Sequence, residues 1–226
     1  MTATRREFLE RIAGGSALAA GLPFASPATL HEFDAAAQPQ QAQSWDMSWV
    51  SRVTGPHKAV FDVPEVESGY GVWRSNIWME QYKEVLRAAD RDLKTVLILR
   101  HNGVALAMTQ AFWDEYGIGK AKNATHPITL QATDKNPALM GEAEGVPAPF
   151  SNFGLRGFLS RGGIVLACNL AFAECVGRVK DKHGGTDEAA RTRALQGLVP
   201  GVIMQPSGVF AAVRAQQAGA VYVRAS

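Results

Sequence analysis

One stretch decides the fold: Gly162-Gly163-Ile164-Val165-Leu166-Ala167-Cys168-Asn169-Leu170-Ala171-Phe172. Its apolar part, residues 164–167, is typical of a parallel strand whose two faces are both buried. A helical pattern follows at once and predicts a helix over residues 169–182. Cys168 therefore stands at the carboxyl end of the strand, beside the first amide groups of the helix. Open α/β sheets bind ligands at such strand ends, and a helix amino terminus raises the thiolate fraction of a neighbouring cysteine.

Four further runs of strand length lie on either side of this stretch, and helical patterns separate them. The strands are expected at residues 58–63, 94–99, 201–204 and 220–224. The helices are expected at residues 73–89, 105–116, 153–161, 189–198 and 209–217. Strands that alternate with helices indicate a parallel sheet with helices on both faces. We therefore predict an α/β protein: a three-layer α/β/α sandwich with a mostly parallel five-stranded sheet.

Composition narrows the classes of function. The chain has 226 residues, 46% of them apolar, and a formal net charge of +2. It has no basic tail, so we expect no nucleic-acid partner. It has no Gly-rich phosphate-binding fingerprint and no P-loop, and we expect no cofactor. Its two cysteines, Cys168 and Cys175, lie two helical turns apart, about 10 Å, which is too far for a disulfide or a redox pair. Without a His/Cys cluster they also make no metal site.

The first residues are typical of a targeting segment. Arg5-Arg6-Glu7-Phe8-Leu9 matches the Arg-Arg-x-Phe-Leu core of a twin-arginine export signal, and the Gly/Ala-rich run that follows is short for a membrane span. We predict a signal peptide over residues 1–37, the twin-arginine export machinery as a partner, and a periplasmic location. Cleavage fits after Ala37, and also after Ala25 or Ala28. An uncleaved anchor, or an ordinary amphipathic helix with a chance Arg-Arg pair, stays an alternative.

Two segments differ in composition from the rest. Residues 38–57 are polar, with Trp45 and Trp49 four apart, and predict a linker or a short helix that docks on the domain of residues 58–226. Residues 120–152 are rich in Pro, Gly and Asn. A loop of this length in a compact domain is usually functional or an insertion.

Polar side chains follow the predicted strands. Parallel strands end at the same edge of a sheet, so these side chains should line one pocket. We expect a catalytic pair and five substrate-binding residues there: Cys168 and His101, with Tyr70, Arg100, Asn102, Asn169 and Ser207.

Each of these residues also has a plainer interpretation. Cys168 would be an inert buried residue, as free cysteine often is. His101 would only form a hydrogen bond with a loop carbonyl. Arg100 would be solvated or would pair with an acidic side chain. Ser207 would cap the following helix. Whether the chain is an enzyme is left open.

Several short motifs resemble the DsrE/DsrF-like family and its exported branch. They are the strand that ends at Cys168, Leu97-Ile98-Leu99-Arg100-His101, Trp113-x-x-Tyr116-x-x-Gly119, Val199-Pro200-Gly201-Val202 and Pro206-Ser207-Gly208. The resemblance covers about residues 58–224. It implies a parallel α/β sandwich, a homo-oligomer, and persulfide sulfur carried on a cysteine that follows a strand, the position of Cys168.

The relay members of that family are cytoplasmic, whereas this chain begins with an export signal and carries the segment 120–152. The resemblance thus implies a periplasmic protein that handles sulfane sulfur, with a small molecule or a sulfur carrier as its partner. The alternative is a non-catalytic module for small-ligand binding or assembly.

Overall fold

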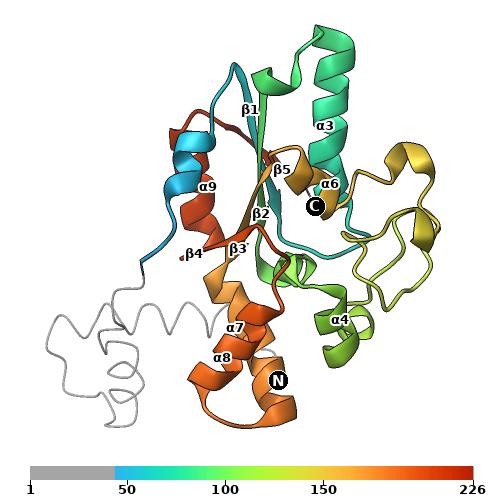
Figure 1. Ribbon diagram of the computed structural model, residues 1–226, viewed down its shortest axis with the longest axis vertical. Coiled ribbons are helices and arrows are strands. Elements are labelled where there is room, and N and C mark those ends of the chain that lie inside the picture. The colour runs from blue at the N-terminus through green and yellow to red at the C-terminus, as the bar shows by residue number, and fades with distance from the viewer. Residues whose placement is uncertain (1–43, 226) are drawn as a thin grey trace, which may run out of the picture. The chain divides into compact units, whose positions relative to one another are not determined.

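A five-stranded sheet forms the centre of the computed structural model, which describes residues 44–225 (Figure 1). Its strands are β1 His57–Val63, β2 Leu93–Leu99, β3 Ile164–Cys168, β4 Val202–Gln205 and β5 Val221–Arg224. Their order is β4-β3-β2-β1-β5, and every neighbouring pair is parallel. The predicted α/β class and five-stranded sheet are confirmed. The predicted signal peptide lies outside the described residues.

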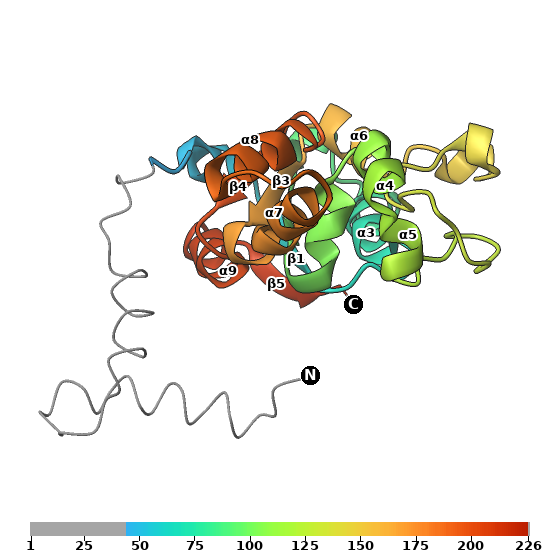
Figure 2. The same ribbon diagram turned by 90° about the horizontal axis from the view of Figure 1, so that it is seen from below.

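Helices cover both faces of the sheet, as the predicted sandwich requires. They are α3 Tyr70–Leu86, α4 Gln110–Tyr116, α5 Ile118–Ala121, α6 Leu155–Ser160, α7 Asn169–His183, α8 Asp187–Gln196 and α9 Gly208–Gln217. Figure 2 shows α3 and α9 on opposite sides of the strands. None of the helices within residues 44–225 is long and apolar enough to cross a membrane.

The two faces have separate apolar cores because successive side chains of a strand point to opposite sides. In β2, Leu97 and Leu99 pack in a core with α3, α4 and α7, whereas Val96 and Ile98 pack in a second core with α9. Both sets of side chains are fully buried. This explains why the strands read as continuous apolar runs instead of alternating ones.

The predicted helix over residues 105–116 is wrong in extent. A 3₁₀ helix, η4 His101–Ala107, comes first, and α4 begins only after Thr109. Thr109 is extended, and its hydroxyl accepts a hydrogen bond from the Phe112 N–H, which caps α4. The residue before it, Met108, bridges to Leu198 in an isolated β-pairing. The backbone therefore leaves the helical path where this pairing forms.

The segment before β1 packs on the α9 face. It holds a 3₁₀ helix, η2 Ser48–Arg52, whose Trp49 is fully buried in the same core as Val96 and Ile98. The Gln205 side chain at the end of β4 donates to the Asp46 carbonyl over 2.9 Å. Residues 45–53, which we call the strap, are thus attached to the sheet by the buried side chains of Trp49 and Val53 and by the Gln205 amide.

The long segment between α5 and α6 is also folded onto the domain. It contains two 3₁₀ helices, η5 Glu142–Glu144 and η6 Ala148–Phe150. Asn136, fully buried, donates to the carbonyls of Leu106 and Met108 and accepts from the Ala138 N–H. A hollow of about 390 Å³ lies between this segment and α6.

Candidate functional site at the carboxyl edge of the sheet

Cys168 occupies the junction between strand and helix that the sequence indicates. It is the last residue of β3 and the N-cap of α7, and its Sγ accepts a hydrogen bond from the Ala171 N–H over 3.5 Å. The residue is only 6% exposed. Both cysteines are free. The sulfur therefore faces the partial positive charge of a helix amino terminus, within a nearly closed environment.

Cys175 lies two turns further along α7 and belongs to the core with Phe172 and Val179. Burial, with a smaller contribution from Glu174, raises the pKa of its thiol to about 12. Since the thiolate is the reactive form of cysteine, Cys175 is a packing residue.

In folded Cys168→Ser protein, we expect Cys175 to resist iodoacetamide at about pH 8, because almost none of its thiol is ionised there. Intact mass spectrometry over several hours measures the reaction, and a urea-unfolded sample, which should react fully, is the control. Equal rates in the folded and unfolded samples would contradict the assignment of Cys175 to the core.

Arg100 pairs with an acidic side chain, which is one of the two plainer interpretations given above for this residue. Its guanidinium forms a bidentate ion pair with Asp62, with Nε–Oδ1 and Nη2–Oδ2 both at 2.7 Å. The Tyr222 hydroxyl donates to the same carboxylate over 2.5 Å. The hydrogen bonds that they donate to Asp62 raise the pKa of Arg100 and that of the Tyr222 phenol. Asp62, 2% exposed, is the charged residue within the buried run 59–63 of β1, and a charge in such a run is the sequence signal for a paired acid.

His101 and Asn102, which follow β2, belong to a polar network with Glu65, which follows β1. The His101 Nδ1 pairs with Glu65 Oε1 at 3.3 Å, and Asn102 donates to Glu65 Oε2 over 2.8 Å. Lys122 links Asn102 to Glu174, with both contacts at 2.7 Å. His101 has a positive φ of 50°, which is unusual for a residue with a side chain. Its imidazole is exposed and turned to Glu65.

The remaining predicted residues have separate partners. Asn169 Oδ1 accepts from the Arg191 guanidinium over 2.6 Å. Ser207 accepts from the Phe210 N–H over 3.0 Å and so caps α9. Tyr70 begins α3 and packs edge-on against Trp73, away from the strand-end residues that follow β3 and β4.

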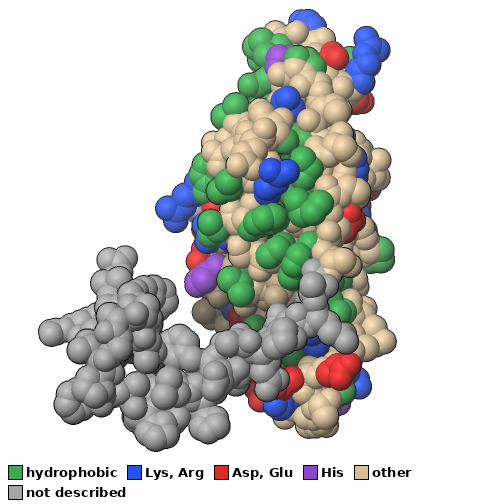
Figure 3. All heavy atoms as spheres, turned by 90° about the vertical axis from the view of Figure 1, so that its left-hand side faces the viewer, with side chains coloured by type: hydrophobic (Ala, Val, Ile, Leu, Met, Phe, Trp, Pro, Cys, Tyr) green, Lys and Arg blue, Asp and Glu red, His purple; other side chains and the backbone are tan. Residues whose placement is uncertain are grey.

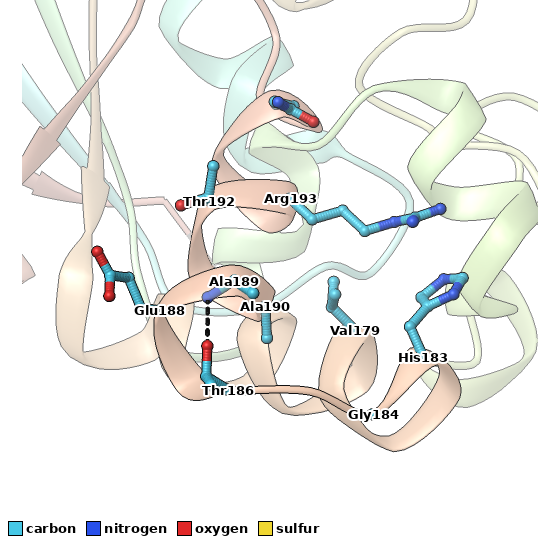
Figure 4. Close-up of a pocket in the computed structure, with 10 residues that line it drawn as sticks. Val179, His183, Gly184, Thr186, Glu188, Ala189, Ala190, Thr192 and Arg193 are labelled. Atoms are coloured by element: carbon cyan, nitrogen blue, oxygen red, sulfur yellow. Dashed lines mark hydrogen bonds between the residues drawn. The ribbon is translucent and has the colours of Figure 1, made fainter.

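One hollow lies away from these residues, on the outer helices. It measures about 570 Å³ and is lined by α7, α8 and the loop between them (Figure 4). The His183 and Arg193 side chains extend to the same side, where both contact Glu115, at 2.8 Å and 3.0 Å. The hydrogen bond from His183, with that from Arg193, lowers the pKa of Glu115. None of the seven predicted site residues lines this hollow or the one beside α6.

Compared with known proteins, the chain matches no family model, no curated protein and no solved structure. The resemblance to the DsrE/DsrF-like family therefore depends on the sequence motifs alone. Across residues 44–225, no three His, Cys, Asp or Glu side chains are grouped so as to hold a metal ion.

Proposed function

We propose that the chain is a periplasmic DsrE-like protein that handles sulfane sulfur, with Cys168 as the persulfide carrier and the twin-arginine pathway as its route of export. The observation that supports this proposal is the hydrogen bond from the Ala171 N–H to the Cys168 sulfur at the start of α7. A helix amino terminus favours an anion, and both a thiolate and a persulfide are anionic. The amino terminus of α7 therefore favours both the free thiolate of Cys168 and its persulfide.

The supporting groups differ from those expected from the sequence. Arg100 is paired with Asp62 and His101 with Glu65, so neither is available to stabilise the sulfur in this arrangement. The α7 amides and the residues packed around them take that role. The transfer needs only a nucleophilic thiolate and a donor that carries a sulfur atom it can release.

Incubation of the mature protein with polysulfide is expected to add one sulfur atom at Cys168. Intact mass spectrometry, followed by peptide mapping after alkylation, locates the adduct. The adduct should persist in Cys175→Ala, because the Cys175 thiol of the parent protein is buried and protonated, and it should be absent in Cys168→Ser. An unmodified Cys168 in protein whose thiol still accepts iodoacetamide would count against sulfur handling.

The alternative, a non-catalytic module for binding or assembly, is favoured by one specific observation. The α9 helix exposes Val209 (69%), Phe210 (37%) and Val213 (47%), and the edge strand β5 exposes Val221 (69%). Figure 3 shows hydrophobic side chains gathered on the face that carries η2 and α9. Contiguous apolar patches of this kind commonly mark interaction sites. A stable oligomer by sedimentation, combined with an inert Cys168, would favour this function.

A further inference from the structure

Arg191, on α8, is fixed against the first turn of α7 by two contacts. Its Nη2 donates to Asn169 Oδ1 over 2.6 Å, and its guanidinium lies 5.8 Å from the centre of the Phe172 ring. Asn169 directly follows Cys168 and is the first residue of α7. Because both contacts are with the first turn of α7, the guanidinium lies at the amino terminus that also holds the sulfur.

Within residues 44–225, no ion pair joins Arg191 to a carboxylate. Among residues 44–225 its contacts are Asn169 and the Phe172 ring, whereas Arg100 and Arg193 are paired with acids. A guanidinium has five N–H donors, and the first amides of a helix lack partners within the helix. The Ala171 amide already bonds the sulfur. The remaining donors and the positive charge favour an anionic group beside Cys168.

Gln205 supplies an independent sign of a ligand at the same place. The register of β3 and β4 pairs it with Cys168, so both side chains leave the same face of the sheet at the same height. Gln205 is fully buried, and its Nε2 donates to the carbonyls of Asp46 and Met204. In the described part of the chain its Oε1 has no hydrogen-bond partner. A buried acceptor without a donor is unfavourable, and an S–H group of a ligand would satisfy it.

We infer that Arg191 binds the anionic group of the compound that reacts at Cys168, and that this compound is a carboxylate-bearing persulfide, R–S–SH. The carboxylate is held by Arg191, and the S–H donates to Gln205 Oε1. The persulfide part of this inference rests on the proposed function, whereas the anion-binding role of Arg191 does not.

The transfer is balanced without an oxidant or a reductant. The Cys168 thiolate attacks the outer sulfur of R–S–SH, and a bond forms between Sγ and that sulfur. The S–S bond of the donor breaks, and its electron pair leaves with R–S⁻. The proton stays on the transferred sulfur, so the protein ends as Cys168–S–SH.

The test compares reagents of equal size that differ in charge. In a Cys175→Ala background, the rate of Cys168 modification is measured by mass spectrometry with the persulfides of 3-mercaptopropionate and 3-mercaptopropionamide, and with iodoacetate and iodoacetamide. The ratio of the anionic to the neutral rate is expected to fall about five- to tenfold in Arg191→Gln. Arg191→Lys, which keeps the charge, should retain part of the ratio.

Arg193→Gln is the matched control, because Arg193 lies two residues further along α8 and pairs with Glu115; its ratio should stay unchanged. If the ratio of the anionic to the neutral rate in Arg191→Gln stays within about twofold of the parent ratio, the role of Arg191 is overturned. Sulfur handling still stands in that case if persulfide transfer occurs. A charge-dependent alkylation without persulfide transfer supports Arg191 but overturns the donor and the proposed function. A folded protein inert to all four reagents overturns both.

Discussion

Asp62→Ala is expected to lower the free energy of unfolding by about 3–5 kcal/mol, since removal of one partner of a buried ion pair leaves an uncompensated charge. Asp62 is 2% exposed and accepts from both the Arg100 guanidinium and the Tyr222 hydroxyl. The Arg100 side chain is two-thirds buried and lies against Gly208, where an added Cβ would come within 2.6 Å of it. Urea denaturation followed by tryptophan fluorescence measures the loss.

The control for this prediction is Asp90→Ala. Asp90 pairs with Lys83 on the surface and its side chain is 81% exposed, so its removal should cost about 0–1 kcal/mol. Similar losses in the two variants would show that burial of the Asp62 ion pair has no special energetic role, and that the strand-end geometry does not depend on it.

Trp49→Ala is expected to lower the free energy of unfolding by about 3–5 kcal/mol, because it removes a large, fully buried side chain from the core beneath α9. This side chain holds the strap on the sheet, so the strap should also become sensitive to protease. Limited trypsin digestion at Arg52, which ends η2, reports this local effect, and urea denaturation reports the global one.

Trp45→Ala is the natural comparison, because Trp45 lies in the same strap but is only partly buried. A loss of about 1 kcal/mol is expected there. If Trp49→Ala instead leaves both the unfolding curve and the digestion rate at the Trp45→Ala level, the strap is an accessory to the domain and contributes little to its stability.

The strands were predictable because burial leaves a simple mark on the sequence. Runs such as that of β2, with Val96 to Leu99 buried on both faces, admit few other interpretations. The helix over residues 105–116 was wrong because the local mark of its break is a single threonine, Thr109, which caps α4. That break depends on the pairing of Met108 with Leu198, ninety residues away, and no local pattern encodes such a contact.

The candidate site was predictable only in its position along the chain. Cys168 and Asn169 could be placed because they follow a recognisable strand. Arg191 could not, because it reaches Asn169 from a different helix. Arg100 and His101 were correctly placed at strand ends, but their partners Asp62 and Glu65 are set by tertiary packing. A sequence shows which residues stand at the edge of a sheet. It does not show which neighbouring side chains they pair with.

The helices that follow β3 and β4 leave the sheet in different directions. α7 packs with the core that contains Leu97, whereas α9 packs with the core that contains Ile98. Neighbouring parallel strands whose connections diverge in this way form a topological switch point, where the main chain itself opens a crevice. In this protein the diverging pair ends at Cys168 and Gln205. The path of the backbone thus places the cysteine at the position where open α/β sheets bind their ligands.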